Sequence, residues 1–143
     1  ICRLRTWGLM RTIPEVTLLE PTDSVMLADL MRQTKDMYGV FYIRITRKVV
    51  DKVFEDGSTF EIGKAVELRD GSDVTLITSG YCTTDTIKAA EILAKEGISA
   101  KVLNMFTWKP LDVEAIVAAA QKTGAIVTVE NHNVINGPWF CCG

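Results

Sequence analysis

The sequence is poor in the residues that build metal and disulfide sites. It contains one histidine, His132, and four cysteines, none of which belongs to a Cys-x-x-Cys pair. One imidazole and scattered thiols cannot supply the ligand set of a structural zinc site, so we expect no metal site. We interpret the cysteines as free thiols of a cytoplasmic protein.

Long apolar runs and a strong charge of one sign are also absent. No segment approaches the ~20 apolar residues that span a bilayer, and residues 1–10 show no signal-peptide pattern. The formal net charge is -2, which favours neither nucleic acid nor a membrane surface as a partner. The chain begins at Ile1 rather than Met, and we expect it to be a fragment.

Glycine-rich phosphate loops are missing as well. No Gly-x-Gly-x-x-Gly follows a predicted strand, and no Gly-x-x-x-x-Gly-Lys-Ser/Thr occurs. A dinucleotide-binding or P-loop fold is therefore unsupported. What the chain does contain is ordinary globular composition, with 48% hydrophobic and 24% charged residues, arranged in alternating strand-like and helix-like segments.

The first of these segments extend to about residue 50. Residues 16–20 are predicted as a strand, followed by a helix that Asp23 or Ser24 caps and that ends near Gly39. Residues 40–45 are β-branched and aromatic and predict a second strand. A strand–helix–strand order implies a parallel pair. These elements are too few to bury a core of their own.

A polar connection over residues 51–59 leads to a second unit, residues 60–143. Ala65–Arg69 and Val74–Thr78 flank Asp70-Gly71 and predict a hairpin. The order of the following elements predicts an α/β fold with a mostly parallel sheet and helices on both faces. These elements are a helix at 84–96, a strand at 98–104, a helix at 110–122 that Gly124 closes, and a strand at 125–130.

Polar side chains gather where the predicted parallel strands end, which is where open α/β sheets bind ligands. The segments are Ser79–Thr84, Asn104–Lys109 and Glu130–Asn133. Thr83 and Thr84 could bind an anion at a helix start, but we interpret them as helix caps. Within the second segment, Phe106 and Trp108 are interpreted as packing residues.

Three candidate reactive side chains have simpler structural interpretations. His132 could be a general base, yet no nucleophile accompanies it, so we interpret it and Glu130 as structural. Cys82 follows a glycine turn near a helix start, which could lower its pKa. We prefer the interpretation of Cys82 as a half-buried small residue.

Basic residues cluster after the strand at 40–45. Arg44, Arg47 and Lys48 stand close together there, and the guanidinium fork suits phosphate. From the residues alone, a solvated basic patch is the preferred interpretation. Arg11 could pair with Glu15 or reach across an interface, and the sequence does not separate these alternatives.

Taken together, five stretches resemble the C-terminal half of the transketolase family. The match runs from Gly8 to Gly137 and is specific as an ordered set. The stretches are GLMRTIPEVTLLEPTDS (8–24), VFYIRITRK (40–48), FEIGKAVELRDGSDVTLITSG (60–80), AAEILAKEGISAKVLNMFTWKPLD (89–112) and GAIVTVENHNVING (124–137).

This resemblance implies a division of the chain. Residues 1–50 would be the remnant of a thiamine-diphosphate pyrimidine-binding domain, 51–59 a linker, and 60–143 a transketolase C-terminal domain that lacks its final helix. Both ends depart abruptly from the family pattern, and we expect truncation or reading-frame slips there. Cys141 and Cys142 then carry no chemistry.

The resemblance also implies an activity, the transfer of a two-carbon ketol unit between sugar phosphates. Arg47 matches the family's arginine that contacts the substrate phosphate, whereas no catalytic or cofactor-binding residue is carried over. Thiamine diphosphate and Mg²⁺ would serve the complete enzyme, and we expect neither to bind this fragment alone, which would be inactive. The partner would be a second copy of the chain or a complementary N-terminal subunit.

Three alternatives remain open at this point. Deoxyxylulose-phosphate synthase and the β-subunit of 2-oxo-acid dehydrogenases share the same layout as the transketolase half. A non-enzymatic α/β module used for oligomerisation is the third. The sequence does not say which sugar phosphates would be used.

Overall fold

The computed structural model of the chain describes residues 6–131, which form helices and strands in alternation around two sheets. The helices are α1 (Thr6–Thr12), α2 (Ser24–Thr34), α3 (Cys82–Lys95) and α4 (Val113–Thr123). The strands are β1 (Val16–Leu19), β2 (Val40–Ile43), β3 (Val66–Arg69), β4 (Val74–Thr78), β5 (Ala100–Asn104), β6 (Thr107–Lys109) and β7 (Ile126–Val129). No helix in this described part is long and apolar enough to cross a membrane.

The first sheet has the strand order β2-β1-β6. β1 and β2 run parallel with α2 between them in the chain, as the strand–helix–strand pattern predicted. The carboxylate of Asp23 accepts a hydrogen bond from the backbone N–H of Met26 at 2.9 Å, so the predicted cap is confirmed. The helix ends at Thr34, earlier than the predicted end near Gly39.

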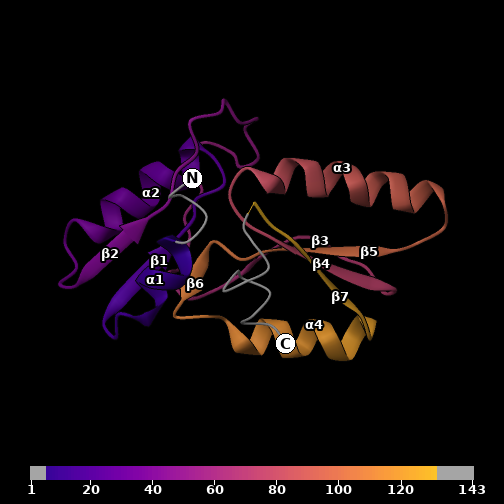
Figure 1. Ribbon diagram of the computed structural model, residues 1–143. Coiled ribbons are helices and arrows are strands. Elements are labelled where there is room, and N and C mark those ends of the chain that lie inside the picture. Colours follow the sequence, from indigo (N-terminus) through magenta and orange to yellow (C-terminus); the bar gives the residue numbers. More distant parts are fainter. Residues whose placement is uncertain (1–5, 132–143) are drawn as a thin grey trace.

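The second sheet has the order β3-β5-β4-β7. β4 runs parallel to β5 and to β7, while β3 is antiparallel to β5. Helices α3 and α4 lie on opposite faces of this sheet (Figure 1). The expected α/β architecture, a mostly parallel sheet between helical layers, is thereby confirmed.

The predicted hairpin between Ala65–Arg69 and Val74–Thr78 is wrong. β5 lies between β3 and β4, so the two strands are not neighbours. Their connecting turn instead passes against the start of β5. Gly71 in that turn touches the backbone of Ala100 and Lys101 so closely that a Cβ would not fit.

Two short elements were not predicted, helix α1 and strand β6. They meet through tryptophans, since Trp7 of α1 is 1% exposed and its ring packs edge-on against that of Trp108 in β6. Phe106 and Trp108 are both buried, which confirms their predicted packing roles. Because β6 pairs antiparallel with β1, a segment far along the chain completes the first sheet.

The hydrophobic core is shared between the early and late parts of the chain. One cluster joins Val16 and Leu18 of β1 to Ile77 of β4 and Leu103 of β5. A second joins β1 and α2 to Phe60 and Phe106. Residues before position 50 therefore bury their apolar side chains against later residues, as expected for a region with too few elements of its own.

Two buried carboxylates of the α2 region fix the connection that follows β2. Besides capping α2, Asp23 accepts hydrogen bonds from the backbone N–H groups of Val53 at 2.8 Å and Phe54 at 2.9 Å. Asp29 accepts from the backbone N–H of Phe60 at 2.9 Å. The polar stretch predicted as a linker is thus held against α2 by side-chain hydrogen bonds.

We predict that Asp23→Ala lowers the free energy of unfolding by about 3 kcal/mol, because it removes a helix cap and leaves two further N–H groups without their acceptor. The matched control is Asp36→Ala, because the Asp36 side chain is 76% exposed and its loss should change stability by less than about 0.5 kcal/mol. Urea unfolding followed by circular dichroism measures both. Equal losses in the two variants would contradict the anchoring role of Asp23.

Candidate functional site

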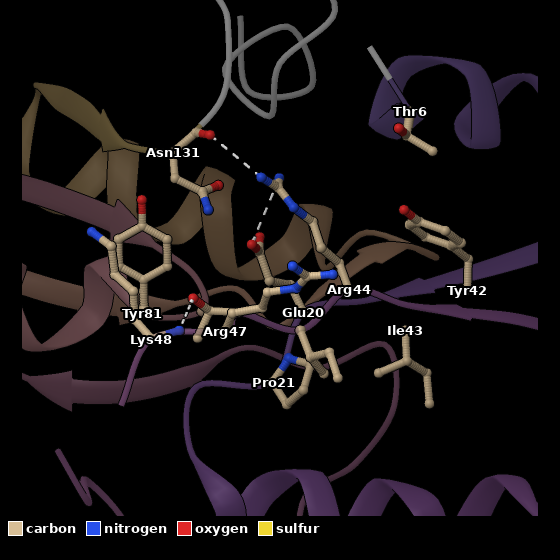
Figure 2. A pocket seen from close by; sticks show the side chains of 13 residues that line it. Thr6, Glu20, Pro21, Tyr42, Ile43, Arg44, Arg47, Lys48, Tyr81 and Asn131 are labelled. Carbon is tan, nitrogen blue, oxygen red and sulfur yellow. Dashed lines mark hydrogen bonds and ion pairs between the residues drawn. The ribbon is translucent and has the colours of Figure 1, made fainter. Parts of the chain in front are cut away.

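A pocket of about 490 Å³ lies where strands of both sheets end. Its walls come from the residues after β1, β2, β4 and β7, whose carboxyl ends converge as they do at ligand sites of open α/β sheets. Figure 2 shows the side chains around this hollow. They include Glu20, Arg44, Arg47, Lys48, Tyr81 and Asn131.

Glu20 is the buried acid of the pocket, with 5% of its surface exposed. Its Oε2 accepts a hydrogen bond from the hydroxyl of Ser79 at 2.6 Å, and its Oε1 lies 3.7 Å from Nη1 of Arg44. Gly80 has a φ of 55° and approaches Glu20 so closely that a Cβ would lie 2.9 Å from its Cγ. Glycine at position 80 therefore serves both the left-handed turn and the seating of Glu20.

Arg44 is held on three sides. Its side chain is 17% exposed and pairs with Glu20, and Nη2 donates to the carbonyl of Asn131 at 3.4 Å. The guanidinium also lies 5.6 Å from the ring centroid of Trp7, within cation–π range. The charge of Arg44 is therefore largely compensated inside the protein.

Arg47 and Lys48 differ from Arg44 in that no carboxylate of the described residues pairs with them. Both are exposed and line the pocket, and none of the ion pairs among residues 6–131 includes either one. The ammonium of Lys48 lies 4.8 Å from the ring centroid of Tyr81. The basic cluster seen in the sequence therefore divides in two. Arg44 is largely buried and paired with Glu20, whereas Arg47 and Lys48 are exposed and line the pocket.

The threonines after β4 do not cap α3. The N-cap residue is Tyr81, and no side chain makes the capping hydrogen bond. Thr83 is fully buried, and its hydroxyl accepts a hydrogen bond from the amide of Asn104 at 2.8 Å. The same amide donates to the hydroxyl of Thr22 at 2.7 Å. The capping interpretation of Thr83 and Thr84 is therefore wrong, because Thr83 instead links the ends of β1 and β5 through a buried polar cluster.

Cys82 is a buried thiol rather than an activated one. It is 8% exposed, and burial raises its pKa, with further increases from the charges of Glu20 and Asp85. The possibility that the helix start lowers the pKa of Cys82 is wrong, because desolvation and neighbouring carboxylates outweigh it. The preferred interpretation of Cys82 as a small, unactivated residue agrees with this, although the side chain is buried rather than half-buried.

The remaining sequence candidates lie outside the pocket or outside the described residues. Arg11 forms no ion pair with Glu15 among the described contacts, and its carbonyl accepts a hydrogen bond from Lys109 at 3.2 Å. Glu130 is half-buried at the end of β7. His132 and the cysteines at positions 2, 141 and 142 lie outside residues 6–131.

The pocket suits an anion and does not fit a metal-bound cofactor. Within residues 6–131, no group of three or more histidine, cysteine, aspartate or glutamate side chains could hold a metal ion. The pocket's buried acid, Glu20, already accepts a hydrogen bond from Ser79 and pairs with Arg44. Residues 6–131 therefore supply no cluster of ligands for Mg²⁺.

The mostly parallel sheet, with a pocket at the carboxyl ends of its strands, places the chain among the open-sheet α/β proteins. Within that class, the chain belongs to the transketolase C-terminal domain family, since the family model described as "Transketolase, C-terminal domain" matches residues 63–138.

Three known proteins illustrate the similarity. The 6-deoxy-6-sulfo-D-fructose transketolase subunit SqwH of Clostridium sp. (strain MSTE9) is 43% identical over 130 residues, which cover 91% of this chain and 40% of that protein. A 1-deoxy-D-xylulose-5-phosphate synthase of Heliobacterium modesticaldum is 38% identical over 132 residues, covering 91% and 20%. A solved structure described as "Split gene transketolase, inactive beta4 tetramer" superimposes with a TM-score of 0.94 at 35% identity, covering 97% and 46%. The chain thus spans less than half the length of each of these proteins.

We predict that Cys82 reacts with N-ethylmaleimide more slowly at pH 7 to 8 than a thiol of ordinary pKa, because burial keeps it neutral and shielded. The rate should rise only as the pH passes above the ordinary thiol value of about 8.5. Mass spectrometry of a chain in which the other three cysteines are serine gives the rate. The same chain in urea is the control, and equal rates at neutral pH would contradict the prediction.

Proposed function

We propose that this chain is the C-terminal component of a thiamine-diphosphate-dependent transketolase that transfers a two-carbon ketol unit between sugar phosphates. Membership of the family supports the proposal, as does the name of a relative, a transketolase subunit. The observation that carries it is the pocket at the strand ends, which Arg47 and Lys48 line and where no carboxylate of residues 6–131 lies within ion-pair distance of either.

In this proposal, residues 6–131 bind and orient the substrate. The Arg47 guanidinium binds the substrate phosphate through charge-assisted hydrogen bonds, and this fixes the distance of the sugar's reacting end from the pocket. Thiamine diphosphate and Mg²⁺ would be held by parts of the complete enzyme outside residues 6–131.

The domain division read from the sequence forms part of the same proposal. Residues 1–50 belong to a pyrimidine-binding domain and residues 60–143 to the transketolase C-terminal domain. The pocket draws Glu20 and Arg47 from the first range and Tyr81 from the second. Substrate binding then needs both ranges together.

We predict that ketol transfer appears when the chain is mixed with a thiamine-diphosphate-binding transketolase subunit.

In that mixture, Arg47→Ala should raise KM for the sugar phosphate by about 10- to 100-fold, because the variant loses a charged hydrogen bond to the phosphate. The value of kcat should change less, because the lost contact is made in both ground and transition states. The control is Arg32→Ala, an arginine of α2 that is 66% exposed and outside the pocket lining.

Two results would count against this function. The first is absence of ketol transfer while both chains are folded, which would leave the non-enzymatic oligomerisation module in its place. The second is an equal rise of KM in the Arg32 and Arg47 variants, which would remove Arg47 from the phosphate site.

A second candidate reaction follows from the relative that is a 1-deoxy-D-xylulose-5-phosphate synthase. The same reconstituted mixture distinguishes the two by its product. Formation of 1-deoxy-D-xylulose 5-phosphate in place of ketol transfer between sugar phosphates would assign the chain to this second reaction.

A further inference from the structure

The second sheet has a switch point between β4 and β5, and open α/β sheets bind their ligands beyond such points. The two strands run parallel, and Thr78 and Asn104 form their last pair. β4 leads into α3 on one face of the sheet, whereas β5 leads through β6 into α4 on the other face (Figure 1). A ligand of this sheet would therefore be expected just beyond Thr78 and Asn104.

The segment that follows β1 of the first sheet occupies this place. The backbone N–H of Glu20 donates to the carbonyl of Phe106, after β5, at 2.7 Å. The carboxylate of Glu20 accepts the hydrogen bond from Ser79, after β4, at 2.6 Å. The hydroxyl of Thr22 accepts from the amide of Asn104 at 2.7 Å. Since Glu20 and Thr22 are both buried, this segment fills the switch point of the second sheet.

The groups around the Glu20 side chain favour a carboxylate. The hydroxyl of Ser79 donates to it, and the guanidinium of Arg44 places a positive charge 3.7 Å away, as Figure 2 shows for the arginine. Nη1 of Arg44 is buried and has no hydrogen-bond partner within residues 6–131, so the site retains a donor for an anion. Gly80 leaves the necessary space, because a Cβ there would lie 3.0 Å from Cδ of Glu20.

We propose that the switch point of the second sheet is a carboxylate-binding site, formed by Ser79, Gly80 and Arg44, and that its ligand is the chain's own Glu20. The binding site of one sheet thereby joins it to the other sheet. When the Glu20 carboxylate is removed, a small external carboxylate binds in its place. Glu20 and Gly80 both line the open pocket, which gives such a solute access. This inference is independent of the proposed function, because it requires neither sugar phosphate nor cofactor.

The test is urea unfolding of the intact Glu20→Ala chain at pH 7, in sodium acetate and in sodium chloride of equal concentration. The substitution leaves Arg44 buried without its partner, so the unfolding equilibrium constant should rise by about 100-fold or more. Acetate at about 0.2 M should lower that constant about tenfold relative to chloride, as expected for a ligand of the folded state with a dissociation constant of about 20 mM. Acetamide, which has a similar shape and no charge, should have little effect.

Two controls show where acetate acts. Leu30→Ala removes a fully buried side chain from an apolar cluster, so it destabilises the chain without exposing a donor or a charge. Acetate should not stabilise this variant relative to chloride. The double variant Glu20→Ala/Ser79→Ala should lose most of the acetate effect, because the hydroxyl donor of the site is gone.

Three results would overturn the inference. Equal stabilisation of the Leu30 and Glu20 variants by acetate would show a general salt effect. Acetamide as effective as acetate would show that the site does not recognise the charge. The third result comes from Glu20→Gln, which keeps the shape of the side chain and so tests the site even if Glu20→Ala does not fold. It should raise the unfolding equilibrium constant about tenfold, and stability equal to that of the unchanged chain would contradict a carboxylate site.

Discussion

The carboxylate of Glu20 is buried where strands of both sheets end, and the pocket is organised around it. A buried carboxylate costs several kcal/mol unless charges and hydrogen bonds compensate it. Glu20 obtains both, from the hydroxyl of Ser79 after β4 and from the guanidinium of Arg44 after β2. The contacts that compensate this one charge therefore join the residues that follow β1, β2 and β4. Only glycine fits at position 80, because the Glu20 side chain occupies the space that a Cβ would need.

The same interaction divides the basic cluster into residues in two different environments. Arg44 contacts Glu20 and Trp7, so pairing with a ligand would require it to give up its ion pair with Glu20. Arg47 and Lys48 come from the same turn but remain outside that pairing. In the sequence these basic residues resemble one solvated patch. In the structure only Arg44 is largely buried, because burial of a charge is costly unless an opposite charge pairs with it.

Local patterns were sufficient for most of the fold. The strand–helix–strand order and the Asp23 cap are confirmed because a cap and a hydrophobic period act over a few residues. The hairpin was wrong because Asp70-Gly71 specifies a turn but not which strand lies beside the next one, and β5 takes that place. Strand β6 was missed because three residues are too few to show an alternation of hydrophobic and polar side chains, and because its partner β1 lies far back in the chain.

The site was predicted in part, by its arginines and by the rule that ligands gather at strand ends. Glu20 was missed because its partners, Ser79 and Arg44, are distant in the sequence and its own neighbours suggest only a strand end. The shared core explains why such distant contacts persist. β6 completes the sheet of β1, and Trp7 packs on Trp108, so the early and late parts of the chain cannot shift without exposing both rings. The pocket between their strand ends is therefore a property of the two parts folded together, and neither part forms it alone.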